Sequence, residues 1–473
     1  MIKDHLKYLR ALPLYIVGGT IRDRILKRYS PDIDIVVPSD TCKVALDFAR
    51  KSGGSYVLLD DNPIQKMERV AVKSDEGVLL FDFAGMQGAS IEEDLRKRDF
   101  TINAMAIPLE DYLKDGFDVL IDPLGGLADL HKKRISVLSD ESFENDPLRM
   151  LRAFRFAAQL DFQIDMKTRK SITLNSGMLK DVSWERIRDE FFKILSIDSC
   201  VPFIVEMDKL RLLEVIFPEI LPMKGARQNG YHHLDVWGHS LLTLENVEIV
   251  LRNPEDYFAG YSPDMKEYLD SGSIPGRSVK SIIKLIALLH DAGKPETKSR
   301  GADGRVMFLG HEDAGKRIAE EVVRRLKLNR REIVFVKDMV GGHMYLINLS
   351  FMDSLSKKRI LRFFRKHPGE FWAYFILFIA DSMAARGSDV PIDRIQKTVS
   401  MAKKMLNKYY NRIKPRFETP RLITGRELID KFGLPPGPLL GKVLSDIEDA
   451  RMEGKIKEKG EALKYAEKII AAK

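Results

Sequence analysis

The sequence is poor in cysteine: its 473 residues include only Cys42 and Cys200, which stand far apart and outside any paired motif. This argues against a disulfide framework and favours a reducing, cytoplasmic setting. A charged start without an apolar core predicts that the chain carries no export signal. The longest apolar run, residues 371–380, is too short to span a bilayer, so we expect a buried helix and no membrane partner.

Internal repeats and low-complexity segments are also missing, and the length is too great for a single hydrophobic core. We expect four domains, at residues 1–138, 139–225, 226–385 and 386–473. The first alternates strand-like runs with helical stretches, whereas the others are predicted to be helical, so the fold class is α+β. The net charge of +8 favours a polyanionic partner such as RNA, although so mild an excess also fits an ordinary surface.

Two aspartates separated by one residue, Asp32 and Asp34, lie on a strand-like run of the first domain. Alternate side chains of a strand share a face, so both carboxylates point the same way while Ile33 and Ile35 face a core. Carboxylates so placed can hold a pair of Mg²⁺ ions, which activate an attacking hydroxyl and neutralise a leaving pyrophosphate. The pattern predicts nucleotidyl transfer, and a solvated turn after Pro31 would not explain the apolar alternation.

A glycine pair, Gly18-Gly19, ends the preceding strand and opens a helix, with Arg22 one turn in. The backbone there can approach a triphosphate closely, and the helix N-terminus supplies N–H groups and positive potential. Further along, Arg98 and Asp99 stand where a charged cluster meets an apolar segment, a place suited to phosphate and ribose hydroxyls. Taken alone, these two residues also fit a surface ion pair.

The helix that opens the second domain carries a pattern able to select a base. We predict Asp146 at its N-cap, and Arg149, Arg152 and Arg155 recur every third residue. A carboxylate accepts from an exocyclic amine and a guanidinium donates to a ring nitrogen or carbonyl, so Asp146 with Arg149 would accept C or A and reject U or G. Arg152 and Arg155 would remain for the triphosphate. A solvated basic face explains the spacing equally well.

Together these motifs resemble those of the class II tRNA nucleotidyltransferases, which are the CCA-adding enzymes and bacterial poly(A) polymerases of the DNA polymerase beta superfamily. The matching segments are Gly18-Gly19-x-x-Arg22-Asp23, Asp32-x-Asp34, Arg98-Asp99-Phe-Thr-Ile-Asn-Ala, Asp122-Pro-Leu-Gly-Gly126, Asp146-Pro-Leu-Arg149, Trp184-Glu-Arg-Ile, Ile423-Thr-Gly425 and Pro436-Gly437. The resemblance implies a catalytic head followed by an all-helical neck, body and tail. It also implies template-independent, two-metal addition of C and A from CTP and ATP to a tRNA 3′ end, with release of pyrophosphate.

By the same resemblance, Asp32 and Asp34 are the catalytic, Mg²⁺-binding residues. The implied nucleotide-binding residues are Gly18, Gly19, Arg22, Arg98, Asp99, Asp146, Arg149, Arg152 and Arg155. The chain departs from the family pattern at Asn145, which replaces a common glutamate, and at Lys97, which replaces an arginine.

A third departure concerns the segment between Asp82 and Glu93, which is short. Many full CCA-adding relatives carry a longer flexible loop there, and relatives that add only CC lack it. A CC-adding enzyme is therefore one alternative to full CCA addition, and a poly(A) polymerase is another.

The third domain holds the residue order of an HD metal site, with further histidines at His311 and His343. The residues of this site are His239, His290, Asp291 and Asp381. Imidazoles with carboxylates suit a divalent metal that activates water. The region resembles HD domains fused to some tRNA nucleotidyltransferases, which implies a phosphohydrolase for 2′,3′-cyclic phosphates. A lone His-Asp dyad is more often structural, and an HD phosphohydrolase with an inactive RNA-binding head is a further alternative.

In the last domain, cations alternate with aromatics between Lys403 and Phe417. This surface suits the RNA backbone and exposed bases, or is a solvated helix face. A small, polar stretch at 271–276 predicts a surface loop. The sequence gives no indication of the oligomeric state.

Overall fold

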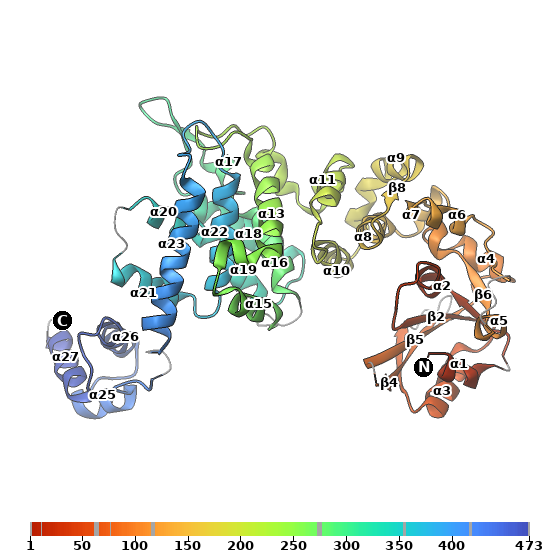
Figure 1. Cartoon of the computed structure of the whole chain (residues 1–473), viewed down its shortest axis with the longest axis horizontal. Helices are drawn as coiled ribbons and strands as arrows, with labels where there is room; N and C mark the ends of the chain where they lie inside the picture. The colour runs from red at the N-terminus through yellow and green to blue at the C-terminus, as the bar shows by residue number, and fades with distance from the viewer. Residues whose placement is uncertain are drawn as a thin grey trace. The chain divides into compact units, whose positions relative to one another are not determined.

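The computed structural model in Figure 1 describes residues 2–10, 12–60, 66–75, 77–114, 119–271, 277–352, 356–415 and 419–471. The chain divides into two compact units, Met1–Pro218 and Glu219–Lys473, called unit 1 and unit 2 below. Unit 1 contains the predicted head and nearly all of the neck, and unit 2 contains the predicted body and tail. The division into four domains stays a prediction. Most of the predicted loop at 271–276, and Phe417 in the tail, lie outside the described residues.

The head of unit 1 is built on a six-stranded sheet with the strand order β3-β4-β5-β2-β1-β6. The strands are β1 (Tyr15–Val17), β2 (Asp32–Val37), β3 (Ser55–Asp60), β4 (Met67–Ser74), β5 (Gly77–Gly85) and β6 (Ala106–Pro108). Neighbouring strands are antiparallel, except that β2 and β5 are parallel. The sheet and the helices around it confirm the predicted mixed α/β head of an α+β chain.

The two faces of β2 differ as the alternation of its residues predicts. Ile33 and Ile35 lie opposite Phe81 and Phe83 of β5 and are buried. Phe48 of the covering helix packs on these two rings, with centroids 4.8 and 5.4 Å away. The opposite face of β2 therefore carries the aspartates and is left for chemistry.

Helices surround this sheet, and the neck follows it. The head helices are α1 (Ile2–Leu6), α2 (Gly18–Ile25), α3 (Thr41–Ser52), α4 (Ile91–Arg96), α5 (Leu109–Leu113) and α6 (Gly126–His131). The neck consists of the short strands β7 (Arg134–Ile135) and β8 (Gln163–Ile164) with α7 (Glu141–Asn145), α8 (Arg149–Leu160), α9 (Met166–Asn175), α10 (Trp184–Leu195), α11 (Val201–Lys209) and α12 (Leu212–Ile216). The neck is therefore helical apart from one two-residue parallel pair.

The prediction of Asp146 as the N-cap of the neck helix is wrong. Helix α8 begins at Arg149 after Leu148, and Asp146 directly follows α7. The Asp146 carboxylate accepts a hydrogen bond from the Leu148 amide at 3.2 Å, within the turn that joins the two helices. The side chain thus stabilises a turn before the helix, because Pro147 separates the two helices there.

Unit 2 is helical in its described part apart from one small strand pair. Its elements are α13 (Val236–Arg252), α14 (Pro254–Phe258), α15 (Ser262–Asp270), α16 (Val279–Leu289), α17 (Lys294–Thr297), β9 (Ser299–Arg300), β10 (Val306–Met307), α18 (His311–Arg325), α19 (Arg330–Gly342), α20 (Met344–Ser350), α21 (Lys357–Lys366), α22 (Phe371–Ala384), α23 (Arg394–Lys408), α25 (Gly425–Phe432), α26 (Pro438–Met452) and α27 (Lys459–Ala471). Helix α22 contains the apolar run 371–380 and is buried, as predicted. Among the described residues, no helix combines the length and the apolar character needed to cross a membrane.

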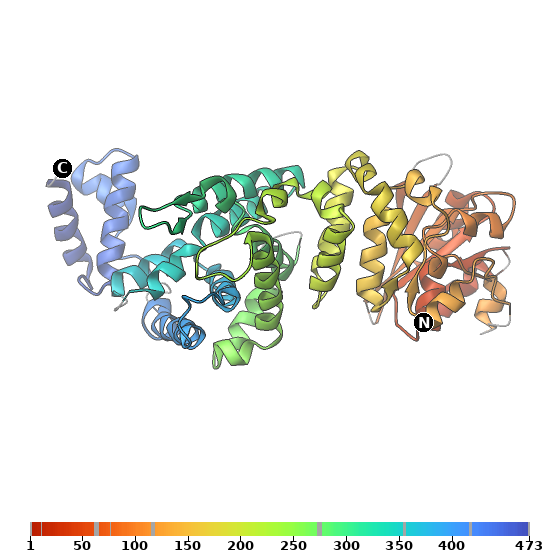
Figure 2. The ribbon, with the colours of Figure 1, turned by 90° about the horizontal axis from the view of Figure 1, so that it is seen from above.

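The last three helices of unit 2, drawn in the bluest shades of Figures 1 and 2, form a cluster of their own. Leu428 of α25, Val443 of α26 and Ala462 of α27 are fully buried in its core. Thr424 caps α25 with a reciprocal hydrogen-bonding box to Glu427. These three helices therefore share a small core of their own within unit 2.

Candidate functional site

One face of the head sheet gathers three carboxylates. Asp34 of β2 lies opposite Asp82 of the parallel strand β5, and Asp32 lies two residues away on the same face. Arg69 of β4 lies opposite Asp82 and donates two hydrogen bonds of 2.7 Å to its carboxylate. The predicted pair, Asp32 and Asp34, is thus present and is accompanied by a third acid that is already neutralised by an arginine.

The glycine pair lies directly against Asp34. The Gly19 amide donates to Asp34 Oδ2 at 3.0 Å, and the Asp34 amide donates to Thr20 Oγ1 at 2.7 Å. Gly18 has a φ of +61°, and a Cβ atom there would stand 2.9 Å from Arg98 Nη1 and 3.2 Å from Asp34 Oδ2. Only glycine fits both this backbone conformation and this space, so the bend between β1 and α2 fixes the position of the carboxylate.

The electrostatics of this face favour a cation. Burial raises the pKa of Asp34, and the neighbouring negative charge of Asp82 raises it further against the opposing effect of Arg98. Burial likewise raises the pKa of Asp32, with contributions from Asp82 and Asp23. Crowded carboxylates that resist ionisation fit a divalent cation bound by oxygen ligands, which would relieve their repulsion.

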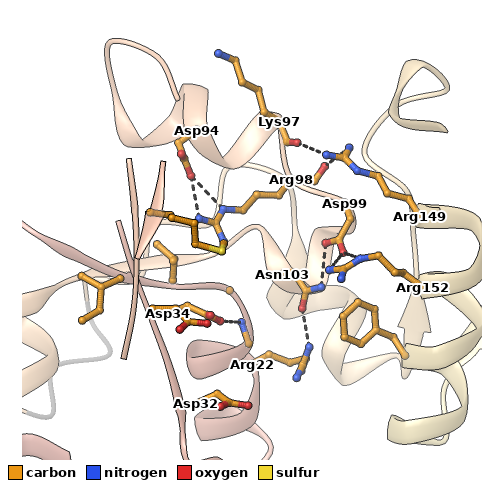
Figure 3. Close-up of a pocket in the computed structure, with 18 of the residues that line it drawn as sticks. Arg22, Asp32, Asp34, Asp94, Lys97, Arg98, Asp99, Asn103, Arg149 and Arg152 are labelled. Carbon is orange, nitrogen blue, oxygen red and sulfur yellow. Dashed lines mark hydrogen bonds and ion pairs between the residues drawn. The ribbon is translucent and has the colours of Figure 1, made fainter. Parts of the chain in front are cut away.

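A chain of hydrogen bonds links the head to the neck, as Figure 3 shows. Arg22 donates to Asn103 Oδ1 at 2.8 Å, Asn103 donates to Asp99 Oδ1 at 3.0 Å, and Arg152 of α8 donates to Asp99 Oδ2 at 2.9 Å. Burial alone would raise the pKa of Asp99, but the charge of Arg152 and the Asn103 hydrogen bond outweigh it and lower the pKa to about 2. Asp99 is therefore an ionised, buried anchor and not the surface ion pair that its sequence context also allowed.

Two further arginines of Figure 3 are held by the segment between α4 and Asp99. Arg98 donates from Nε and Nη2 to Asp94 Oδ2, at 3.1 and 3.0 Å. Arg149 donates to the carbonyl oxygens of Lys97 and Arg98, at 2.8 and 3.0 Å. Burial lowers the pKa of Arg149, because its guanidinium is only partly solvated.

Asp146 and Arg155 have partners on helix α10. Arg186 Nη2 lies 3.2 and 3.0 Å from the two carboxylate oxygens of Asp146 and donates to them. Arg155 donates to Glu190 Oε2 at 2.6 Å, and its cation lies over the Phe156 ring at 4.0 Å from the centroid. A role of Arg155 in binding the triphosphate stays a prediction, and such binding would have to compete with Glu190.

Apart from Thr20 and Glu190, these groups line one pocket of about 610 Å³ at the junction of the sheet face, α2 and the neck helices. Its lining includes every predicted head and neck site residue: Gly18, Gly19, Arg22, Asp32, Asp34, Arg98, Asp99, Asp146, Arg149, Arg152 and Arg155. Pockets of 300–1,000 Å³ suit small ligands, so this one is large enough for a nucleotide. Acids at the sheet and cations along the rim are arranged to hold a metal-bound polyphosphate.

A second cluster of titratable groups lies inside unit 2, on α13, α18 and α22 and at the C-terminal ends of α16 and α19. Two triads there have ligand atoms close enough to hold a metal ion: His239 with His290 and Asp381, and Asp291 with His311 and His343. His239 Nε2 lies 2.9 Å from Asp381 Oδ1. The structure thus brings the four predicted HD residues together and adds the two histidines that stand between them in the sequence.

Asp291 faces both triads. Its Oδ2 atom lies 3.6 Å from His239 Nε2 and 3.3 Å from His290 Nε2, whereas Oδ1 lies 3.8 Å from His311 Nε2 and 3.5 Å from His343 Nε2. Lys294 Nζ approaches Oδ2 at 2.6 Å. Charges of His290 and Lys294 outweigh the burial of Asp291 and hold its pKa well below the usual range. An ionised carboxylate with one oxygen toward each triad can bridge two positions.

The histidine tautomers are set by the local backbone. Nδ1 of His290, His311 and His343 lies 2.9, 2.8 and 2.7 Å from the carbonyl oxygen three residues earlier. A carbonyl oxygen only accepts, so each Nδ1 carries a proton, and Nε2 becomes the acceptor wherever the imidazole is neutral. Burial lowers the pKa of His311 to about 4, which keeps it neutral near pH 7. Imidazole ligands of metals commonly donate their other ring N–H to a carbonyl oxygen in this way, so the residues fit a divalent ion.

Four residues of the two sites were not found by sequence reasoning: Asp82, Arg69, Arg186 and Lys294. Asp82 and Arg69 come beside Asp34 only through strand pairing, which a single sequence does not display. Arg186 lies inside a matched motif but on an exposed helix face. For Lys294 a signal existed, because it lies one helical turn after His290.

Four family models match the chain in order. They are a Poly A polymerase head domain at residues 14–136, a "Probable RNA and SrmB-binding site of polymerase A" at 161–224, an HD domain at 236–366 and a tRNA nucleotidyltransferase domain 2 at 388–466. The matches divide between the two units, with the nucleotidyl-transfer motifs in the first and the His-Asp cluster in the second.

Relatives span nearly the whole chain. The A-adding tRNA nucleotidyltransferase of Deinococcus radiodurans is 30% identical over 460 residues, which is 96% of this chain and 94% of its own length. The CC-adding tRNA nucleotidyltransferase of Geobacter sulfurreducens is 30% identical over 96% of this chain and 91% of its own length. The CCA-adding enzyme of Thermotoga maritima, solved with tRNA, shares the fold, with a TM-score of 0.60 and 24% identity over 100% of this chain and 94% of that one.

Proposed function

Because the chain belongs to the tRNA nucleotidyltransferases, we propose that the pocket of unit 1 adds C and A of the CCA sequence to the 3′ end of tRNA. CTP and ATP would be the donors and pyrophosphate the second product. The observation that carries the proposal is the convergence of Asp32 and Asp34 with the cations of the neck in one pocket. A general RNA poly(A) polymerase would use much the same pocket, so the primer distinguishes the two.

Each group has a task in this scheme. Asp32 and Asp34 would hold Mg²⁺, which when bound activates the 3′ hydroxyl and neutralises the leaving pyrophosphate. The bend at Gly18 and Gly19 lets the triphosphate approach the backbone. Asp146 accepts from the exocyclic amine of cytosine or adenine while Arg149 donates to the adjacent ring acceptor. The protein would thus replace a nucleic-acid template.

The connection between β5 and α4 bears on how many nucleotides are added. It consists of residues 86–90, and it is tied at both ends: the Gln87 amide donates to Asp94 Oδ1 at 3.0 Å and the Ala89 amide to Glu93 Oε2 at 2.8 Å. This short, hydrogen-bonded link supports arrest after CC, since the resemblance associates a longer flexible loop with full CCA addition. The A-adding relative supports an adenosine step, so full CCA addition stays the first candidate and arrest after CC the alternative.

Primer extension distinguishes full CCA addition from arrest after CC. Three tRNA transcripts, ending before the CCA, after one C and after CC, receive CTP, ATP or both with Mg²⁺. We expect growth to CCA when both nucleotides are present, which would show that the short link suffices for adenosine addition; arrest after CC, even with ATP, would identify a CC-adding enzyme. Long tails from ATP on unrelated RNA would identify a poly(A) polymerase. The absence of any extension would overturn the proposal, and Asp32→Asn is the blank for contaminating activity.

For unit 2 we propose a metal-dependent phosphohydrolase acting on 2′,3′-cyclic phosphates, because six buried ligand residues converge there with their tautomers set. The two triads would hold one or two divalent ions, which when bound supply an activated water. Purified protein should hydrolyse 2′,3′-cyclic AMP with a divalent metal and carry it in elemental analysis, whereas Asp291→Ala should lose both. The exposed His233→Ala serves as a matched histidine control. Equal metal content in the wild type and Asp291→Ala would refute the centre.

We also place the enzyme in the cytoplasm. Neither Cys42 nor Cys200 takes part in a disulfide, which supports a reducing compartment. Fractionation of the native host with an antibody to the chain would test this.

A further inference from the structure

The carboxylate proposed to read the base is held by a residue outside the expected pair. Arg186, in the first turn of α10, donates from Nη2 to both oxygens of Asp146, at 3.2 and 3.0 Å. The side chain of Arg186 is 54% exposed and that of Asp146 is 28% exposed. Both line the pocket, so the contact lies at the point where the base would enter.

Arg149 is fixed differently. Each of its two amino groups donates one hydrogen bond, to the backbone carbonyl oxygen of Arg98 or of Lys97, and keeps a second N–H for the base. The two members of the proposed base-reading pair are therefore oriented independently, one by a side chain of α10 and one by the backbone that carries the phosphate-facing Arg98. Removing the α10 contact should disturb Asp146 and leave Arg149 in place.

The contact leaves room for a base. An ionised carboxylate offers about four acceptor sites. The Leu148 amide uses one on Oδ1, and Arg186 Nη2 uses one on each oxygen. One further site remains, so a nucleobase amine can bind Asp146 without displacing Arg186. This favours a positioning role over a competing one.

We propose that Arg186 determines base specificity by positioning Asp146: it holds the carboxylate oriented as an acceptor, so that the pocket selects bases that present an amine. The inference rests on the proposed nucleotidyl transfer. Uracil and guanine present a carbonyl where cytosine and adenine present an amine, and an oriented anion repels that carbonyl. Without the guanidinium, Asp146 can rotate toward water, and the rejection of U and G weakens.

The test compares nucleotide selectivity. For Arg186→Ala, we expect the ratio of kcat/KM for CTP over UTP to fall about tenfold, near the lower end of what one base-reading contact contributes. Arg186→Lys, which keeps one charged donor, should recover part of the ratio, and Arg186→Gln less. Arg169→Ala is the matched control, because it removes another half-exposed guanidinium of unit 1, paired with Glu206 away from the pocket.

The outcomes are separable. A structural ion pair would lower the rates with all nucleotides equally, so an unchanged CTP to UTP ratio in a folded Arg186→Ala protein overturns the inference. If the alanine variant does not fold, the ratio in Arg186→Gln decides in the same way. If the wild type extends no tRNA, the proposed function fails, and the inference is then decided by the ratio of equilibrium CTP and UTP binding in the wild type and the variants.

Discussion

At the scale of single residues, Asp34 is expected to support catalysis but to lower the stability of the metal-free protein. Its pKa is raised by burial and by Asp82 in the folded state, so the metal-free protein loses stability as the pH rises from the unfolded-state value toward the raised one. The loss is complete once the pH exceeds the raised pKa. We expect Asp34→Asn to melt at a higher temperature than the wild type without metal, by about 2–4 °C for each kcal/mol gained.

The same variant should lose tRNA extension by more than the roughly 10–100-fold that loss of an outer metal-site partner costs. Adding Mg²⁺ should raise the melting temperature of the wild type and leave Asp34→Asn unchanged, because only a ligand that binds the folded state stabilises it. Differential scanning calorimetry with and without Mg²⁺ measures both effects. An identical Mg²⁺ response in the two proteins would remove Asp34 from the metal site.

Gly18 permits a second residue-level prediction with an internal control. Gly18 and Gly53 both have positive φ, +61° and +67°, but a Cβ at Gly18 would meet Arg98 and Asp34, whereas one at Gly53 meets nothing within 4 Å. We expect the positive φ to cost both Gly18→Ala and Gly53→Ala about 1–2 kcal/mol of stability, with a further loss at Gly18 from the contacts of the added Cβ. Only Gly18→Ala should weaken CTP binding, as measured by calorimetric titration. A comparable loss of affinity in Gly53→Ala would mean that strain, and not the approach to Arg98, is responsible.

At the scale of elements, the sequence predicts a helix or a strand well where its apolar residues recur at one regular spacing. The residues of α10 are those that the amphipathic run 184–195 predicts, and β2 has the predicted alternation. Strands β4 and β6 were not predicted, because Glu68 and Arg69 interrupt the apolar alternation of β4 and because β6 has only three residues. The partners of a strand depend on distant segments, so the arrival of Asp82 beside Asp34 lay beyond local reasoning.

Helix α23 carries an element-level prediction about RNA. Two grooves flank it, one lined by Lys403 and Lys404 and the other by Lys404 and Lys408. Reversing all three lysines to glutamate should weaken tRNA binding and flatten its dependence on salt, with a smaller slope of log K against log salt. Filter binding between 50 and 200 mM salt measures this.

The control for that experiment reverses Lys43, Arg50 and Lys51 on α3, which changes the net charge equally. These exposed side chains lie on the helix that covers the apolar face of the sheet, away from the pocket carboxylates. A slope that falls equally in both triple variants would point to the overall charge, and an unchanged slope in the α23 variant would take this helix out of the RNA path.

At the scale of the whole molecule, the two candidate centres lie in separate compact units. Each centre has its own candidate metal ligands, and the covalent chain joins the two units. We expect Asp32→Asn to abolish tRNA extension and spare hydrolysis of 2′,3′-cyclic AMP, and Asp291→Ala to do the reverse. Both assays on both variants, with melting curves, measure this. Loss of both activities in either variant without unfolding would contradict the independence of the centres.

The order of motifs along the chain predicted which residues belong to each candidate centre, because the motifs of the family that it resembles follow one another in a fixed order. The contacts between these residues could not be predicted in the same way. The share of Asp291 between two triads, and the contact of Arg186 with Asp146, arise from side chains brought together by packing. The sequence thus predicted the residues of each candidate site more readily than the hydrogen bonds and ion pairs between them.

The parallel pairing of β2 with β5 has a consequence for how the protein reaches its native state. The two strands that carry Asp34 and Asp82 are separated along the chain by α3, β3 and β4. Contacts of such high sequence separation raise the contact order, and their loop-closure entropy is recovered late on the folding pathway. The pairing of β1 with β6 and the contact of Arg22 with Asn103 join segments that lie still farther apart along the chain. Nucleotide transfer should accordingly begin only once all of these long-range contacts of the head have formed.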